Sequence, residues 1–282
     1  MNLKIEPSDN GPPAPLISVI MNCYNGEKYL SDAINSVLSQ TMANWELIFW
    51  DNQSTDESQN IVKSYNDSRI KYYFAPTHTT LGKARNLAVS RATGTWITFL
   101  DTDDLMLPNN LSTQAIFMNS DVGIIYGRTK LLYECGSESD GFLRRLTLGD
   151  VYPKILPLPS GSIFKQLTRS CFIPLPAAII SRKSYVKVGG IDDSLRMSED
   201  YDLFLKISRI EKVISHDRIE TVYRIHRDNL SQSHLHQTFR ESTALIRRHS
   251  TGLTRILGLF MWRMRYIKTL AIKNRIREWK FL

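Results

Sequence analysis

Cysteine is scarce in this sequence, and its spacing excludes two classes of site. The three cysteines, Cys23, Cys135 and Cys171, share no short spacing. We therefore expect neither a disulfide framework nor a zinc site built from closely spaced thiolates. Unpaired cysteines are typical of a reducing compartment, so we expect a cytoplasmic protein.

Long apolar runs are also missing. No stretch reaches the ~18 uninterrupted apolar residues of a membrane-spanning helix. Residues 1–15 contain one lysine and two adjacent prolines but no apolar segment of the signal-peptide kind, so we expect a flexible tail there. With 42% hydrophobic and 23% charged residues over 282 positions, the composition is that of a folded chain with one large or two small domains. It excludes collagen-like and fully disordered proteins.

Acidic residues are rare in the last segment, 253–282, which holds eight basic residues and one acidic residue. This segment therefore carries +7 of the chain's net charge of +8. Because no aromatic platform or groove-reading element accompanies the charge, we expect no nucleic-acid partner.

The same segment has two apolar stripes at helical spacing. The first comprises Leu253, Leu257, Phe260, Met264, Ile267 and Ala271, and the second comprises Leu259, Trp262, Tyr266 and Leu270. A helix with two apolar sides needs two partners. One is the main domain, and the other is either an anionic membrane surface or a second subunit.

Short apolar runs alternate with helical patterns through the first half of the chain. The runs that read as buried strands are 16–21, 45–50, 70–74, 96–100 and 123–126. Four or five such strand and helix units predict an α/β fold with a mostly parallel sheet, covered by helices on both faces. Residues 134–176 are irregular, and strand or helix patterns resume at 177–181, 183–188 and 201–210.

Acidic residues follow two of the predicted strands at the point where each strand ends. Asp51 ends the second run, and residues 101–104 contain three aspartates after the fourth. Ligands bind at this edge of an open parallel sheet. Clustered carboxylates suit Mg²⁺ or Mn²⁺, with a diphosphate as the natural companion. The alternative is that Asp103 or Asp104 only caps the helix near Pro108.

Two other nucleotide-binding classes are disfavoured by the residues at the strand ends. The turn after the first strand, residues 22–27, has one glycine with bulky neighbours, so a dinucleotide-binding dehydrogenase is not expected. No Gly-Lys-Ser/Thr comes after any predicted strand, so a phosphate-loop NTPase is not expected either.

Four segments carry a resemblance to a known family. They read ISVIMNCYNGEKYL, SVLSQTMANWELIFWDNQSTDES, LGKARNLAVSRATGTWITFLDTDDLMLP and GGIDDSLRMSEDYDLFLKIS. In this order and spacing, over residues 16–210, they resemble the family 2 glycosyltransferases, which are inverting enzymes of the GT-A fold. The resemblance implies a nucleotide-sugar donor and a divalent metal ion, Mn²⁺ or Mg²⁺.

The resemblance also implies donor-binding residues. Asp51 matches the acid that binds the nucleoside base, and Asn25 and Glu27 lie in the first turn of that pocket. Arg85 and Asn86 match the Arg-Asn pair beside the nucleotide. Residues 51–56 read DNQSTD where the family usually has Asp-Asp-Gly-Ser-Thr-Asp, which leaves the donor base open. UDP is favoured, before dTDP and GDP.

Metal ligands and a base are implied in the same way. Asp101 and Asp103 match the DxD motif, whose second acid chelates the metal ion. His226 lies in a segment that resembles the family's Arg-x-His, as a third metal ligand or a diphosphate contact; the alternative is a surface-loop histidine. Asp200 matches the general base.

Inverting transfer itself requires one carboxylate to take the acceptor's proton, and a metal ion would offset charge on the leaving diphosphate. The alternative for Asp200 is a charge that stabilises a helix N-terminus, or a cap shared with Ser198.

The sequence thus predicts a tail at 1–15, a GT-A catalytic domain at 16–235 and a basic helical extension at 236–282. The catalytic domain divides into a nucleotide-sugar half, 16–120, and an acceptor half, 121–235. The expected function is inverting transfer from a nucleotide sugar to a glycan or lipid-linked acceptor in cell-surface polysaccharide synthesis. The expected place is the cytoplasm, peripheral to the inner face of the membrane.

Two alternatives stay open. A sugar-1-phosphate nucleotidyltransferase would need a glycine-rich, basic loop after the first strand, which residues 22–27 do not provide. A catalytically inert relative that binds a glycan or a partner is disfavoured by the presence of Asp101, Asp103 and Asp200, but only turnover excludes it.

Overall fold

The computed structural model describes residues 16–133, 150–226, 229 and 234–278, with side chains described up to residue 271. The predicted tail at 1–15, residues 134–149 of the irregular stretch and the last four residues of the basic segment lie outside this range. The elements in chain order are β1 (Ile17–Cys23), α1 (Glu27–Leu38), β2 (Trp45–Asp51), α2 (Ser58–Lys63), β3 (Ile70–Phe74), α3 (Leu81–Val89), β4 (Trp96–Phe99), β5 (Leu105–Met106), α4 (Asn110–Ala115), β6 (Val122–Tyr133), β7 (Val151–Tyr152), α5 (Phe164–Leu167), the 3₁₀ helix η2 (Leu175–Ala177), β8 (Ala178–Ser181), α6 (Arg182–Lys187), α7 (Glu199–Ser208), β9 (Lys212–Ile225), α9 (Leu235–His249) and α10 (Gly252–Glu278).

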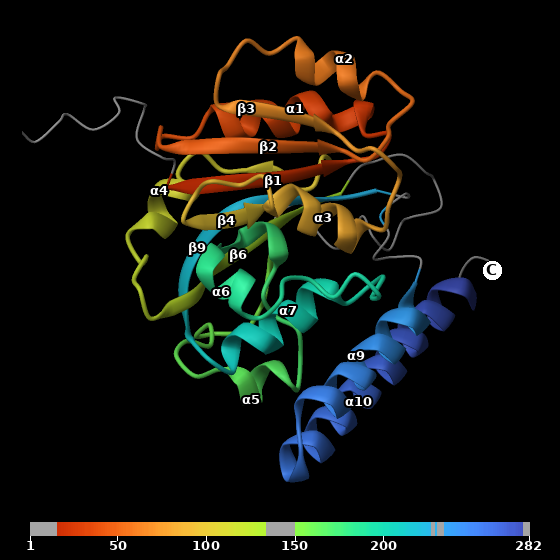
Figure 1. Ribbon diagram of the computed structural model, residues 1–282. Coiled ribbons are helices and arrows are strands. Elements are labelled where there is room, and N and C mark those ends of the chain that lie inside the picture. The colour runs from red at the N-terminus through yellow and green to blue at the C-terminus, as the bar shows by residue number, and fades with distance from the viewer. Residues whose placement is uncertain (1–15, 134–149, 227–228, 230–233, 279–282) are drawn as a thin grey trace, which may run out of the picture.

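One sheet organises the fold, in the strand order β3-β2-β1-β4-β8-β6-β9-β5, with β7 paired to β6. The strands β3, β2, β1 and β4 pair in parallel with one another, as expected for alternating strands and helices. β8 then joins β4 and β6 with antiparallel pairing on both sides. The predicted α/β fold with a C-terminal helical extension is confirmed (Figure 1). The expectation of a mostly parallel sheet is wrong, because four of the eight pairings between the described strands are antiparallel.

Two hydrophobic clusters cover the two faces of the sheet. Alternate residues of β1 divide between them: Val19 and Met21 belong to the cluster that includes α1, and Ile20 belongs to the cluster that includes α3 and α7. In Figure 1, α1 and α2 lie on one side of the strands, and α3, α6 and α7 lie on the other. The central strands β1, β2 and β4 are buried on both faces and are therefore mostly apolar.

β9 is the main element that the sequence pattern did not reveal. It extends over fourteen residues and pairs in parallel with β6 along almost its whole length. Its middle reads SHDRIE, so the apolar periodicity that marks the earlier strands is absent. Its last residue, Ile225, is next to His226, so β9 delivers that histidine to the candidate site.

α9 and α10 form a helical hairpin along one side of the domain, at the lower right of Figure 1. α10 has 27 residues. In the part of the chain that the structure describes, no helix combines the length and the apolar character that a membrane crossing requires.

Candidate active site

The carboxyl ends of the parallel strands meet at one edge of the sheet. Cys23, the last residue of β1, is in register with Asp51, the last residue of β2. Asn25 and Glu27 connect the turns that follow these strands. The Asn25 side-chain oxygen accepts a hydrogen bond from the Thr55 N–H (2.8 Å), and the Glu27 carboxylate accepts one from the Glu57 N–H (2.8 Å). The two residues predicted in the base pocket thus hold its two turns together.

Asp51 is completely buried at the bottom of these turns. One carboxylate oxygen accepts a hydrogen bond from the Ser54 N–H (2.7 Å), and the other accepts one from the Tyr72 hydroxyl (2.8 Å). Burial and the Asp51 carboxylate raise the pKa of Tyr72, so that this hydroxyl remains a donor at neutral pH. The orientation of Asp51 is therefore defined from both sides.

An aromatic residue after β1 was not singled out from the sequence. Tyr24 follows β1 directly, is 56% exposed, and has its ring centroid 4.4 Å from that of His78. Tyr24 follows Cys23, the register partner of Asp51, and its exposed ring provides an apolar face of the kind on which a base can stack. The signal that could have revealed it is a large aromatic side chain directly after a buried strand.

Arg85 joins the loop after β4 to α7. It lies on α3 and is 4% exposed. One guanidinium nitrogen donates to the Glu199 carboxylate at 2.8 Å, and the other donates to the Asp101 carboxylate at 2.9 Å. Glu199 is 114 residues away from Arg85 in the sequence. One buried guanidinium therefore connects the loop after β4 with the first turn of α7.

Two acids in the first turn of α7, Glu199 and Asp200, have raised pKa values. Burial raises the pKa of Glu199 to about 7, although the positive charge of Arg85 acts to lower it. Burial also raises the pKa of Asp200, again opposed by Arg85, and the negative charge of Asp101 adds to the increase. Asp200 lies in the first turn of α7, where a helix N-terminus also favours negative charge. A carboxylate with a raised pKa is a better proton acceptor than an exposed one.

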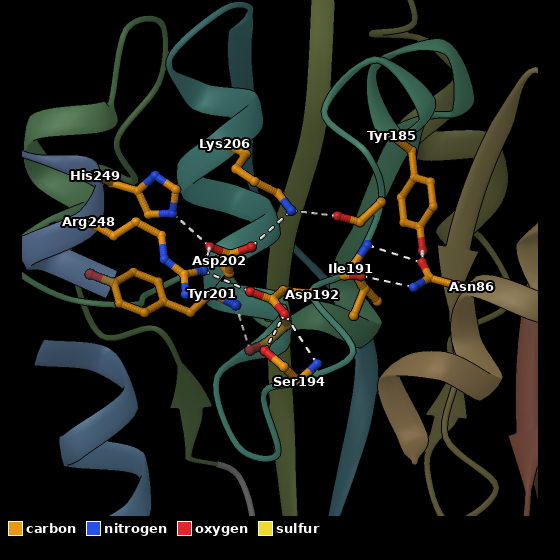
Figure 2. A network of polar contacts seen from close by, with 12 residues as sticks. Asn86, Tyr185, Ile191, Asp192, Ser194, Tyr201, Asp202, Lys206, Arg248 and His249 are labelled. Carbon is orange, nitrogen blue, oxygen red and sulfur yellow. Dashed lines mark hydrogen bonds and ion pairs between the residues drawn. The ribbon is translucent and has the colours of Figure 1, made fainter. Parts of the chain in front are cut away.

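Asn86 is turned away from these acids. Its side-chain oxygen accepts hydrogen bonds from the Tyr185 hydroxyl (2.5 Å) and the Ile191 N–H (3.1 Å), and its nitrogen donates to the Ile191 carbonyl (2.8 Å). Figure 2 shows these three contacts on the right of the network. Asn86 therefore fixes the loop that leads into α7, whereas Arg85, its neighbour in the predicted pair, faces the acids.

Asp103 and His226 meet although they are 123 residues apart in the sequence. His226 Nε2 lies 2.9 Å from an Asp103 carboxylate oxygen, and Asn229 donates to the same oxygen at 3.3 Å. The His226 side chain is 11% exposed, so the alternative of a surface-loop histidine does not hold. Arg224 supports the loop from β9: its N–H donates to Asp104 at 2.9 Å, and its Nε donates to the Asp103 carbonyl at 3.0 Å.

The capping alternative for these aspartates does not hold either. α4, the helix after Pro108, has Asn109 at its N-cap position and no side-chain capping hydrogen bond. Burial, with the neighbouring charge of Asp101, raises the pKa of Asp103 and that of the fully buried Asp104. These carboxylates are therefore held close together without a capping role, which is a costly arrangement unless a cation joins them.

The residues present fit a divalent ion whose ligands come partly from a substrate. Two ligands at about 2.1 Å from one octahedral ion are about 3 Å apart, and Asp103 and His226 have that separation. Among the described residues, no group of three or more acidic, histidine or cysteine side chains forms a complete metal site. In Mg²⁺-type sites, one or two protein ligands are completed by water and substrate phosphates.

A second polar network surrounds Asp202, which lies in the same first turn of α7 as Asp200. The buried Asp202 accepts a hydrogen bond from His249 (2.7 Å) and pairs with Lys206 (2.9 Å). Arg248 donates to Asp192 at 2.7 Å, and its guanidinium lies 3.9 Å from Asp202. Figure 2 shows these side chains converging between α7 and the end of α9. The helix that carries Asp200 is therefore connected to the C-terminal hairpin through charged groups.

The comparisons with known proteins identify the family. The sequence profile described as "Glycosyl transferase family 2" matches residues 18–184, more than half of the chain. The chain therefore belongs to glycosyltransferase family 2. The resemblance found in the sequence is confirmed, and with it the expectation of a glycosyltransferase at the level of the family.

Two relatives illustrate the sequence similarity. An uncharacterized glycosyltransferase of Rickettsia felis is 31% identical over 229 residues, which cover 77% of this chain and 35% of the relative. The UDP-Glc:alpha-D-GlcNAc-diphosphoundecaprenol beta-1,3-glucosyltransferase WfgD of Escherichia coli is 38% identical over 118 residues, which cover 42% of this chain and 47% of the relative. The chain thus matches about a third and about half of these two relatives' lengths.

Two solved structures show the same fold. Residues 1–349 of S. aureus TarS in complex with UDP-GlcNAc match with a TM-score of 0.68 at 19% identity, over 89% of this chain and 72% of that one. The mannosyltransferase PcManGT from Pyrobaculum calidifontis, in complex with GDP-Man and Mn²⁺, matches with a TM-score of 0.62 at 15% identity, over 94% of this chain and 83% of that one. The predicted GT-A fold is confirmed.

Proposed function

We propose that this protein is a metal-dependent inverting glycosyltransferase, which moves a sugar from a nucleotide sugar to a hydroxyl group of a glycan or lipid-linked acceptor. One observation carries the proposal: Arg85 binds Asp101 on the donor side and Glu199 beside Asp200. This arrangement keeps a carboxylate with a raised pKa next to the place where the donor's diphosphate would lie. It suits a reaction that needs a base and a stabilised leaving group at the same time.

Asp200 is the proposed general base. The acceptor hydroxyl oxygen forms a bond to the anomeric carbon while the bond from that carbon to the diphosphate breaks, and the configuration inverts in this single displacement. The hydroxyl proton passes to the Asp200 carboxylate, and the nucleoside diphosphate leaves. The raised pKa of Asp200 favours this role.

The donor-binding residues are proposed from the geometry of the two turns. Asp51 and Tyr24 lie where the base would bind, with Asn25 and Glu27 holding the turns around it. Asn86 acts through the loop at Ile191, as a positioning residue.

Asp103, His226 and, from the donor side, Asp101 would hold Mn²⁺ or Mg²⁺. When bound, such an ion supplies positive charge that stabilises the departing diphosphate.

The choice of substrates rests on the relatives. WfgD is named for a UDP-glucose donor and a diphosphoundecaprenol-linked acceptor, and TarS binds UDP-GlcNAc. PcManGT binds GDP-Man with Mn²⁺. We therefore favour a UDP-sugar donor and a lipid-linked glycan acceptor, with a role in cell-surface polysaccharide synthesis at the inner face of the membrane. The division into a catalytic domain at 16–235 and an extension at 236–282 is part of this proposal.

The test compares Asp200→Asn with the unchanged protein in a transfer assay. UDP-sugars with Mn²⁺ and a diphosphate-linked lipid acceptor are the substrates. Loss of the base is expected to lower kcat by about 10²- to 10⁴-fold, while UDP still raises the Tm because the nucleotide pocket is intact. Asp193→Asn is the matched control, since Asp193 is exposed in the loop before α7. Full activity of Asp200→Asn would overturn the assignment of Asp200 as the base. If the unchanged protein shows no turnover, the alternative of a catalytically inert relative is favoured.

A further inference from the structure

α10 has a row of apolar side chains that remain exposed in the described part of the structure. The row, which we call the outer stripe, comprises Leu253, Ile256, Phe260, Met264 and Ile267, each between 48% and 69% exposed. At 100° per residue these positions fall within an arc of about 80°, and they extend over about 21 Å of helix. An ordered apolar face of this length is unusual on a protein surface and marks an interaction site.

Another side of α10 is already occupied. Leu259 and Trp262 pack against the larger hydrophobic cluster of the domain, and the Trp262 indole donates to the Tyr201 hydroxyl at 3.3 Å. Tyr266 stacks on Phe239 of α9, with ring centroids 4.2 Å apart. These contacts anchor the helix, whereas the exposure of the outer stripe shows that it lies on another side of α10. Figure 1 shows the hairpin of α9 and α10 along one side of the domain. The outer stripe is therefore not needed to hold α10 in place.

Basic side chains border the outer stripe. Arg263 and Lys268 are both exposed, and by helical geometry they lie on opposite borders of the stripe, about 60° and 80° from its centre. The segment 253–282 holds eight basic residues and one acidic residue. An apolar stripe bordered by cations is the pattern of helices that lie in the interface of an anionic bilayer, where long basic side chains reach the headgroups.

We propose that the outer stripe docks the protein on an anionic membrane surface, with α10 lying in the plane of the interface. Pairing with a second copy through the same face would place two strongly basic segments against each other, so charge favours the lipid surface. The link between docking and catalysis rests on the proposed function, since a lipid-linked acceptor is reached from the membrane surface. Docking itself does not depend on turnover.

The experiment is flotation of the full-length protein with lipid vesicles. Vesicles of phosphatidylcholine with about 30% phosphatidylglycerol, which gives them a negative surface potential, are compared with vesicles of phosphatidylcholine alone. The unchanged protein is expected to float with the anionic vesicles and to be released by high salt, because each basic side chain near the surface adds to binding electrostatically. Phe260→Glu combined with Met264→Glu is expected to reduce the bound fraction at least about tenfold. Ile116→Glu combined with Leu156→Glu is the matched control, because both side chains are exposed outside α10.

Three outcomes would overturn the proposal. The unchanged protein could remain unbound with anionic vesicles, the variant of the outer stripe could bind as well as the control, or light scattering could show a dimer that the outer-stripe substitutions dissociate. Hydrolysis of the UDP-sugar in solution separates this proposal from the proposed function. The outer-stripe variant is expected to hydrolyse the UDP-sugar as fast as the unchanged protein does. If the unchanged protein does not hydrolyse it at all, the proposed enzymatic function is contradicted, but membrane docking is not.

Discussion

Glu46 offers a stability prediction whose size can be worked out from its surroundings. It is buried in β2, and one carboxylate oxygen accepts hydrogen bonds from the Ser18 hydroxyl (2.6 Å), the Thr93 N–H (2.6 Å) and the Thr93 hydroxyl (2.8 Å). Its other oxygen pairs with Lys71 of β3. Burial by itself would raise the pKa of Glu46, but the hydrogen bonds from Lys71, Ser18 and Thr93 outweigh it and lower the pKa from 4.5 to about 2.

The lowered pKa sets both the size and the sign of the effect. A difference of about 2.5 pKa units between the unfolded and folded states corresponds to about 3 kcal/mol of stability. This contribution is fully present above the unfolded pKa of 4.5 and is lost as the pH falls toward 2. At pH 3 it amounts to about 1 kcal/mol. Glu46→Gln removes the charge, so the variant is expected to lose about 3 kcal/mol at pH 7 and about 1 kcal/mol at pH 3.

Urea denaturation followed by tryptophan fluorescence measures this difference, because Trp45 and Trp50 are buried in the same strand. Asp121→Asn is the control, since it breaks an exposed ion pair with Lys212 and is expected to change the free energy of unfolding little. A loss at pH 7 below about 1 kcal/mol, or an equal loss at pH 7 and pH 3, would refute the reasoning.

Two further substitutions test the candidate site. Asp103→Asn replaces a proposed carboxylate ligand by a neutral amide and is expected to lower the affinity for UDP in the presence of Mn²⁺ by at least about tenfold. The affinity is measured from the rise in Tm that UDP causes with Mn²⁺ and with EDTA. If Mn²⁺ strengthens UDP binding equally in the variant and the unchanged protein, Asp103 is not a ligand. His249→Ala removes a hydrogen-bond partner of the buried Asp202 and is expected to cost about 1–3 kcal/mol in urea denaturation. Arg247→Ala, at an exposed position of the same helix, is the control and should change the free energy of unfolding little. Equal losses of stability in the two variants would show that the contact with Asp202 does not cause the loss.

The parallel half of the fold was predictable because its signals are local. The runs at 45–50 and 96–100 are mostly apolar, and each is followed at once by an acid. Those acids must lie at the same edge of the sheet, because successive parallel strands end there. β9 was not predictable in this way. Its charged middle hides the strand periodicity, and its pairing with β6 is a contact between distant parts of the chain.

The directions of the site side chains depended on such distant contacts. From the sequence, Arg85 and Asn86 are equivalent neighbours in a predicted pair. In the structure, Arg85 binds Glu199 and Asp101, while Asn86 binds Tyr185 and Ile191. Adjacent residues on a helix point about 100° apart, so only the packing of α3 between α7 and the loop at Ile191 decides which of them faces the acids.

The sequence by itself determined the class of fold, the acids at the ends of the strands and the presence of two apolar stripes on the last helix. These features depend on the order of apolar and polar residues along the chain, which local periodicity records. Only the tertiary structure decided that Asp103 meets His226, that Arg85 connects Asp101 with Glu199, and which stripe of α10 is packed. Each of these depends on which segments lie side by side, and that is set by burial of the whole core rather than by any single stretch of sequence.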